Sequence, residues 1–120
     1  MGNVLPGIIT IELVSASLTI NTEMFVKMDP YVTVVYNTVS QPNKKTVKTK
    51  VHKSGGQTPQ WNEKFEFLVE SMDDNIIFTV FDKDMFFDDL VGNVFMRVGA
   101  LVSKSINADG NDAPTTLDLF

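Results

Sequence analysis

The sequence predicts an all-β fold, an antiparallel sandwich or barrel built as a single domain. Its 120 residues suffice for one hydrophobic core, and 43% of them are apolar. Short runs alternate apolar and polar residues with a period of two, which is typical of half-buried strands. Turn-forming Gly, Pro, Asn and Asp residues separate these runs. Many short strands with almost no helix favour a sandwich or barrel.

Seven strands are expected in chain order, near residues 8–15, 30–37, 45–52, 61–69, 75–82, 91–98 and 114–119. In the first strand, Ile9 and Ile11 alternate with Thr10 and Glu12. The matching apolar positions of the next five strands are Val32, Val34 and Tyr36; Val47 and Val51; Trp61, Phe65, Phe67 and Val69; Ile76, Phe78 and Val80; and Val94, Met96 and Val98. Of these, we assign Trp61, Phe65 and Phe67 to the core.

The segments between the strands complete the domain. Turns are expected at residues 41–43, 54–59, 73–75 and 107–111, where Gly, Pro, Asn and Asp gather. Residues 99–106 are expected to form one or two helical turns. We expect residues 1–6 to be a loose leader and residues 7–120 to be one domain, whether it stands alone or is excised from a longer protein.

Composition excludes several classes of function. The chain has no cysteine and a single histidine, His52, so thiolate metal sites, cysteine nucleophiles and His-based catalytic sites are disfavoured. It also lacks a Gly-rich phosphate loop and a Gly-x-Ser-x-Gly motif, so we do not expect an enzyme. No apolar run is long enough to span a bilayer, and no signal peptide is visible. Together with the lack of cysteine, these features favour a cytoplasmic protein.

The acidic residues are unevenly distributed. The chain carries 15 Asp and Glu against 10 Lys and Arg, and six of the acids lie in two short segments. Those six are Glu23, Asp29, Asp82, Asp84, Asp88 and Asp89. The remaining nine nearly balance the basic residues, so the body is close to neutral and general nucleic-acid binding is disfavoured.

The segment 82–89 places four carboxylates within eight residues, directly after an expected strand. Such crowding is relieved by a hard divalent cation, and calcium accepts six to eight oxygens in loose geometry. A solvated acidic turn is the alternative. An EF-hand counted from Asp82 is excluded, because its fifth, sixth and twelfth positions hold Phe86, Phe87 and Asn93. A calcium site would therefore be built from loops between strands.

Four segments in order resemble one known family. They are Met28-Asp29-Pro30-Tyr31-Val32, Lys48-Thr49-Lys50-Val51, residues 58–67 (TPQWNEKFEF), and residues 80–92 (VFDKDMFFDDLVG). Each segment alone is a weak signal, but together they look like a C2 domain that covers about residues 7–120. The similarity extends to examples from synaptotagmin, protein kinase C and cytosolic phospholipase.

The resemblance implies an eight-stranded antiparallel Greek-key β-sandwich of the phospholipase-type (type II) topology, with three calcium-binding loops at one end. It also implies a Ca²⁺ cofactor and docking to phospholipid membranes, as in membrane-targeting modules of signalling or vesicle trafficking. The implied metal ligands are Glu23 and Asp29 in the first loop, and Asp82, Asp84 and either Asp88 or Asp89 in the third.

This sequence departs from the family pattern in three places. Glu23 stands where the family usually has Asp. The third loop is one residue shorter than in synaptotagmin-like members, and its likeness to cytosolic phospholipase favours Asp88 over Asp89. Only seven strands are evident, so either the chain was cut from a longer protein or the sheet edge is closed differently. An open edge strand invites pairing with another chain, although a monomer is the main expectation.

Apolar residues occur inside both acidic segments, as Met24, Phe25 and Val26 and as Met85, Phe86 and Phe87. On a sandwich these residues would lie at loop tips, and exposed apolar clusters mark interaction surfaces. We expect them to insert into the bilayer once calcium has neutralised the carboxylates. The alternative is that individual side chains fold back into the core.

A basic stripe is expected on one face of a strand, formed by Lys44, Lys48, Lys50 and His52. Such a stripe can hold anionic or phosphoinositide headgroups, and an ordinary solvated face is the alternative. The sequence thus predicts a Ca²⁺-dependent phospholipid-binding module. A Ca²⁺-independent protein-interaction module of the same fold remains the second hypothesis.

Overall fold

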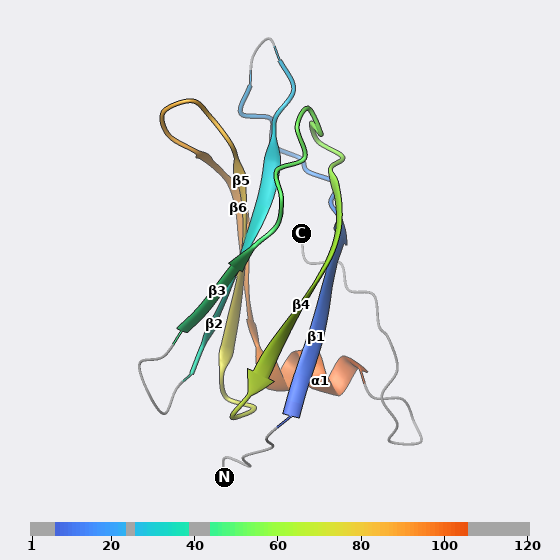
Figure 1. The fold of residues 1–120 in the computed structure, drawn as a ribbon, viewed down its shortest axis with the longest axis vertical. Coiled ribbons are helices and arrows are strands. Elements are labelled where there is room, and N and C mark those ends of the chain that lie inside the picture. Colours follow the sequence, from blue (N-terminus) through green and yellow to red (C-terminus); the bar gives the residue numbers. More distant parts are fainter. Residues whose placement is uncertain (1–6, 24–25, 39–43, 106–120) are drawn as a thin grey trace.

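Six strands and one helix make up the described part of the chain, which comprises residues 7–23, 26–38 and 44–105 of a computed structural model. The elements are β1 (Gly7–Ser15), β2 (Pro30–Asn37), β3 (Lys44–Lys48), β4 (Gln60–Val69), β5 (Asn75–Asp82), β6 (Asp89–Arg97) and α1 (Val98–Ser105). They form an antiparallel four-stranded sheet in the order β3-β2-β5-β6 and a two-stranded sheet of β1 and β4 (Figure 1).

The all-β sandwich prediction is confirmed, and the first six expected strands are all present. Their ends lie within two residues of the expected positions except in β3. The helix begins at Val98, one residue before the expected start. The expected leader 1–6 and the expected seventh strand, 114–119, lie outside the described residues.

The core lies between the two sheets, where strand alternation places every second side chain. Along β2 and β5 each even-numbered residue from 30 to 36 and from 76 to 82 is buried, while the odd-numbered residues lie on the outer face. Phe67 of β4 is also buried, and its ring stacks on Tyr36 at 5.9 Å. Trp61 and Phe65 are half-buried and pack against this core, in agreement with the prediction.

Strand β3 ends four residues earlier than the sequence predicts, and a side chain is the cause. The hydroxyl of Thr49 accepts a 3.0 Å hydrogen bond from the backbone N–H of Val32, the place that a backbone carbonyl takes in a regular ladder. The ladder between β2 and β3 therefore stops at the pair Thr33 and Lys48. Residues beyond Lys48 therefore lie outside the strand.

Three connections meet at one end of the sandwich (Figure 1). The first joins β1 to β2 and the second joins β3 to β4, so both pass from one sheet to the other, whereas the third joins the antiparallel neighbours β5 and β6. We call these connections loop 1 (residues 16–29), loop 2 (residues 49–59) and loop 3 (residues 83–88). Two of the six acidic residues singled out in the sequence lie in loop 1, at Glu23 and Asp29. The other four follow one another from the end of β5 through loop 3 to the start of β6.

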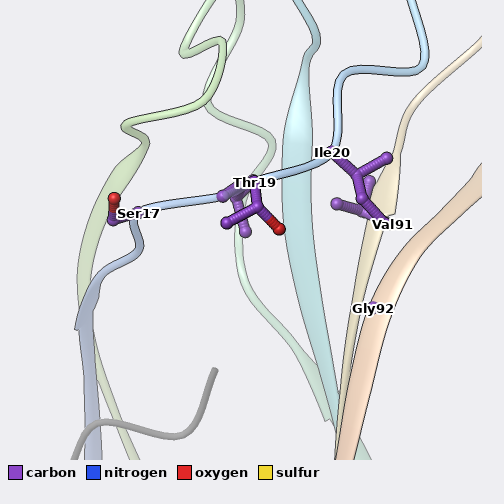
Figure 2. A pocket seen from close by; sticks show the side chains of 6 residues that line it. Ser17, Thr19, Ile20, Val91 and Gly92 are labelled. Carbon is purple, nitrogen blue, oxygen red and sulfur yellow. The ribbon is translucent and has the colours of Figure 1, made fainter.

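Two further observations concern membrane-spanning helices and cavities. Among the described residues, no helix has the length and hydropathy needed to span a bilayer. An apolar cavity of about 70 Å³ lies between loop 1 and β6, lined by Ser17, Leu18, Thr19, Ile20, Val91 and Gly92 (Figure 2). Small-molecule sites usually measure about 300–1,000 Å³, so this cavity does not mark a substrate pocket.

Candidate metal centre

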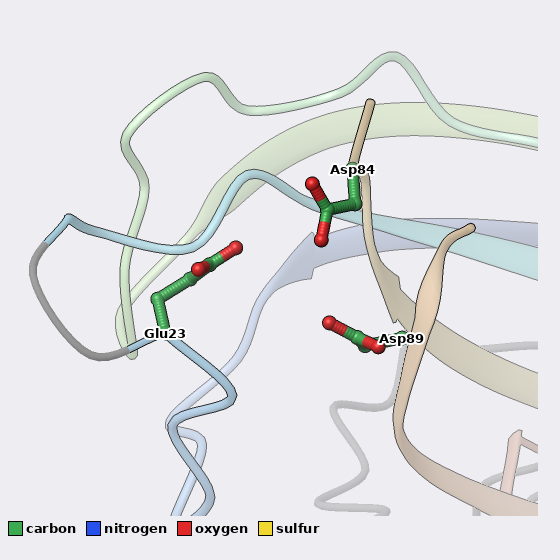
Figure 3. A group of neighbouring side chains, drawn as sticks. All are labelled: Glu23, Asp84 and Asp89. Carbon is green, nitrogen blue, oxygen red and sulfur yellow. The ribbon is translucent and has the colours of Figure 1, made fainter. Parts of the chain in front are cut away.

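Three carboxylates from separate parts of the chain converge at the loop end. Oxygen atoms of Glu23, Asp84 and Asp89 all lie within 4.8 Å of one another (Figure 3). Two oxygens that bind the same calcium ion at about 2.3–2.6 Å can be at most about 5 Å apart. The spacing of the three carboxylates therefore fits one shared hard cation. In physical terms, the donor set consists of the oxygen ligands that calcium prefers.

Different elements deliver these side chains. Glu23 comes from loop 1, Asp84 from loop 3 and Asp89 from the first position of β6. Asp89 is the register partner of Asp82, the last residue of β5, so both belong to the final step of the β5–β6 ladder. Side chains that face each other across an antiparallel pair lie on the same side of the sheet. The end of the ladder thus directs Asp89 toward the inner side, where loop 1 passes.

Asp82 has a structural position at the base of this cluster. Its side chain is fully buried, at 0% exposed. Its Oδ2 accepts a 2.7 Å hydrogen bond from the hydroxyl of Thr22, and its Oδ1 accepts a 2.8 Å bond from the backbone N–H of Asp29. A buried carboxylate with two such donors anchors loop 1 to the end of β5.

Acidic neighbours alter the pKa of Glu23. Hydrogen bonding with the carboxyl of Asp82 raises the pKa of Glu23, and desolvation and the charges of Asp82, Asp84 and Asp89 raise it further. The shift means that negative charge at this point is unfavourable without a compensating cation. The local electrostatics therefore fit a cation site in the same way as the carboxylate spacing.

Asp29 connects all three loops. Its N–H binds Asp82, and its Oδ1 accepts a 2.6 Å bond from the backbone N–H of Ser54 in loop 2. Its backbone carbonyl accepts a 3.0 Å bond from the N–H of Lys83 in loop 3. Ser54 has a left-handed backbone with a φ of 58°, and the bond to Asp29 helps to hold this unfavourable conformation.

Asp88 lies apart from the three converging carboxylates. Its Oδ2 accepts a hydrogen bond from the Tyr31 hydroxyl, and its Oδ1 accepts a 3.1 Å bond from the backbone N–H of Asp84. The ammonium group of Lys83 is 3.8 Å from the same Oδ1. The Tyr31 bond, followed by the Asp84 N–H, lowers the pKa of Asp88. Burial, followed by the bond to Asp88, raises the pKa of Tyr31 to about 12.

The apolar residues of loop 3 are the most exposed of the large hydrophobic side chains in the described chain. Met85, Phe86 and Phe87 are each 84% exposed, and Val26 of loop 1 is 67% exposed. None of these four side chains folds back into the core. Met24 and Phe25, the other two expected tip residues, lie outside the described residues.

The basic residues divide into two groups. Lys44 and Lys48 lie on β3 and are exposed, as is Lys50 just beyond it. His52 is half-buried, and its Nδ1 accepts a 2.9 Å bond from the backbone N–H of Gln60. The His52 ring thus differs from the exposed lysines, since it is engaged with the backbone at the start of β4.

Sequence reasoning did not single out three residues that organise the site, namely Thr22, Tyr31 and Ser54. Each acts as a donor to one of the acidic residues that the sequence did single out. The sequence shows that Thr22 precedes Glu23, that Tyr31 follows Pro30 and that Ser54 begins a Ser-Gly-Gly turn. It does not show their hydrogen-bond acceptors, which lie 25 to 60 positions away along the chain. Glu63 of β4 also supports a loop, since its Oε2 accepts a 2.7 Å bond from the N–H of Lys50.

Comparison with known proteins gives a consistent result. Residues 7–111 match the family model of the C2 domain. The chain is 36% identical over 114 residues to the 16 kDa phloem protein 2 of Arabidopsis thaliana, a match that covers 94% of this chain and 70% of the relative. It is 33% identical over 120 residues to cytosolic phospholipase A2 delta of Mus musculus, covering 92% of this chain but 14% of that protein.

A solved structure of two C2 domains of extended synaptotagmin 2, described as calcium bound, superposes with a TM-score of 0.72 at 20% identity. That match covers 88% of this chain and 39% of the other, and it supports the fold alone. The phospholipase match covers a small part of the enzyme, and the matched family is a domain family. The comparisons therefore support the prediction that the chain is a binding module and not a catalytic domain.

Proposed function

Because the chain belongs to the C2 domain family, whose general role is binding membranes or proteins, we propose that it is a Ca²⁺-dependent phospholipid-binding module. The single observation that carries the proposal is the arrangement of loop 3. Carboxylates that converge with Glu23 flank a tip whose Met85, Phe86 and Phe87 are 84% exposed. A cation site and an apolar contact surface thus share one loop.

The residues of this end have distinct tasks in the proposal. Glu23, Asp84 and Asp89 would hold the cation, while Asp82 and Asp29 hold the loops that present them. Calcium would supply positive charge that offsets these carboxylates and an affinity for lipid phosphate oxygens. In the absence of that charge, the acidic loops are repelled by an anionic membrane surface.

The apolar tips provide the second part of the binding free energy. Fully burying a Phe, Val or Met side chain is worth roughly 1.5–3 kcal/mol. Partial insertion of Val26, Met85, Phe86 and Phe87 would therefore contribute several kcal/mol. The expected tip residues Met24 and Phe25 belong to the same proposal.

Exposed lysines would add contacts with anionic headgroups. Lys44, Lys48 and Lys50 are exposed on and beside β3, an edge strand of the four-stranded sheet. Each basic residue near an anionic surface contributes about 1 kcal/mol. We restrict the lipid-binding stripe to these lysines, because the His52 ring is engaged with Gln60. Phosphoinositide-containing vesicles test this part against vesicles in which the same charge comes from phosphatidylserine.

Vesicle co-sedimentation tests the proposed function directly. Vesicles of phosphatidylcholine and phosphatidylserine are mixed with the protein in calcium and in a chelator. We expect sedimentation in calcium only, and loss of it in Asp84→Asn and Asp89→Asn. Lys64→Gln, on the outer face of β4, is the matched control and should sediment like the unmodified chain.

The alternative, a Ca²⁺-independent protein-interaction module, predicts a different result. In that case the protein would stay in the supernatant under both conditions, and the Asp variants would behave like the unmodified chain. Sedimentation that is equal in calcium and in chelator would also overturn the calcium-dependent proposal, while leaving lipid binding in place.

A further inference from the structure

The tyrosine that follows Pro30 makes a contact that the calcium proposal does not itself use. Tyr31 is half-buried on the outer face of the four-stranded sheet, where its ring stacks on Phe81 at 5.6 Å. Its hydroxyl donates a hydrogen bond to Asp88, which precedes β6. Tyr31 belongs to β2, and Asp88 is the last residue of loop 3, 57 positions later in the chain. The contact therefore ties loop 3 to β2.

Strand alternation explains why Asp88 and Asp89 point in different directions. Tyr31 pairs with Phe81 in the β2–β5 register, and both lie on the outer face, opposite the buried Val80 and Asp82. Asp89 pairs with Asp82 and therefore lies on the inner side, with Glu23. Asp88, one position earlier, lies on the side of Tyr31.

Asp88 also closes loop 3 on itself. Its Oδ1 accepts the backbone N–H of Asp84 at 3.1 Å, across the base of the exposed tip, and Lys83 approaches the same oxygen at 3.8 Å. With the Tyr31 hydroxyl on Oδ2, both oxygens of Asp88 are engaged within the protein. Asp84, which Asp88 holds through its backbone, is one of the three residues that converge on the candidate cation site.

We propose that Tyr31 is a positioning residue that clamps loop 3 through Asp88, and so presents Asp84 and Asp89, rather than Asp88, to the cation. The inference rests on the proposed calcium site and deepens it. It reverses the preference for Asp88 that the likeness to cytosolic phospholipase suggests. Partners that orient metal ligands without touching the metal commonly change affinity by about 10- to 100-fold when removed.

The chain contains a matched control on the same strand. Tyr36 also donates its hydroxyl to an aspartate, at 2.5 Å to Oδ2 of Asp74, but at the far end of β2. Tyr31→Phe and Tyr36→Phe thus remove the same atom from the same strand. A general loss of stability would follow from either variant, whereas an effect on the cation site is expected from Tyr31→Phe alone.

The test is a calcium titration by calorimetry, together with amide hydrogen exchange of Asp84 in the calcium-free protein. We expect Tyr31→Phe to weaken calcium binding about tenfold and to speed exchange at Asp84, while Tyr36→Phe changes neither. Asp88→Ala also removes the acceptor of the Asp84 N–H, so it should weaken calcium binding at least as much as Tyr31→Phe. The double variant should be no weaker than Asp88→Ala alone, because the Tyr31 hydroxyl then has no Asp88 bond left to lose. Asp88→Asn keeps an acceptor for Tyr31 and should bind calcium more tightly than Asp88→Ala.

Several outcomes would overturn the inference. Loss of binding in Asp88→Asn as complete as in Asp89→Asn would make Asp88 a ligand. If Tyr31→Phe leaves both the calcium affinity and the amide hydrogen exchange of Asp84 unchanged, Tyr31 does not clamp loop 3. If the unmodified chain binds no calcium, the proposed function fails and the ligand assignment with it. Exchange at Asp84 then decides separately whether Tyr31 clamps the loop.

Discussion

The backbone N–H of Asp29 donates a 2.8 Å hydrogen bond to Oδ1 of the buried Asp82, 53 positions later in the chain. The carbonyl of Asp29 accepts a 3.0 Å bond from the N–H of Lys83 in return. These two bonds join the start of β2 to the end of β5, just where loops 1 and 3 leave the sandwich. The relative position of the two acidic loops is therefore set by rigid strand ends.

Asp82→Ala should destabilise the protein by about 1–3 kcal/mol, because it leaves the Asp29 N–H and the Thr22 hydroxyl without their acceptor. The free energy of unfolding in calcium-free urea denaturation measures this loss. Asp89→Ala, at the paired position of β6, is the control and should cost less than about 0.5 kcal/mol. Equal losses in the two variants would contradict the anchoring role of Asp82.

Stability without calcium should fall as the pH rises above about 4.3, the ordinary pKa of Glu. Hydrogen bonding with Asp82 raises the pKa of Glu23, so the folded protein binds more protons than the unfolded chain between the two values. Asp88 acts oppositely and in a lower range, since its lowered pKa costs stability only as the pH falls below about 3.9.

Urea denaturation across pH 4 to 7 measures the Glu23 effect. Glu23→Gln should flatten the decline, and saturating calcium should do the same in the unmodified protein. If the free energy of unfolding depends on pH in the same way in Glu23→Gln as in the unmodified protein, the repulsion between carboxylates does not involve Glu23.

Phe86→Ala should weaken vesicle binding about tenfold, which corresponds to a loss of about 1.4 kcal/mol from partial insertion of the ring. The stability of the fold should not change, because the side chain is 84% exposed. Phe95→Ala is the matched control, since Phe95 is 57% exposed on β6 and lies outside the loops. If Phe86→Ala and Phe95→Ala both bind vesicles as well as the unmodified protein does, loop 3 is not the insertion surface.

Tyr36→Phe should cost about 1–3 kcal/mol of stability, because the buried Asp74 loses a donor to its Oδ2 and the N–H of Glu70 loses an acceptor. Burial and then the bond to Asp74 raise the pKa of Tyr36, which keeps the hydroxyl protonated as the donor. Thermal or urea unfolding measures the loss. Unchanged unfolding would mean that solvent replaces this contact without cost.

Hydrophobic alternation predicted most of the fold. In β2 and β5 the buried and outer positions follow the sequence pattern without a break, so both strands were expected with their observed ends. β3 differs because the side chain of Thr49 replaces a backbone acceptor, which a period of two does not reveal. The same contact explains why the strand ends before Lys50 and His52.

The candidate site was predicted only in part. Clusters of Asp and Glu identified the two loops, but the sequence does not show which carboxylates face each other. Asp88 and Asp89 are chemically equivalent in sequence and differ only through the register of β5 with β6 and the hydroxyl of Tyr31. Such contacts depend on residues distant in the chain, and they require the folded structure to be recognised.

The most direct test of a cation site at this end is a calorimetric calcium titration of the unmodified protein beside an Asp84→Asn/Asp89→Asn double variant. We predict saturable heat of binding for the unmodified protein and its loss in the double variant, with the fold of both verified by circular dichroism. Flat heats from the unmodified protein, or equal binding by the double variant, would contradict the calcium site.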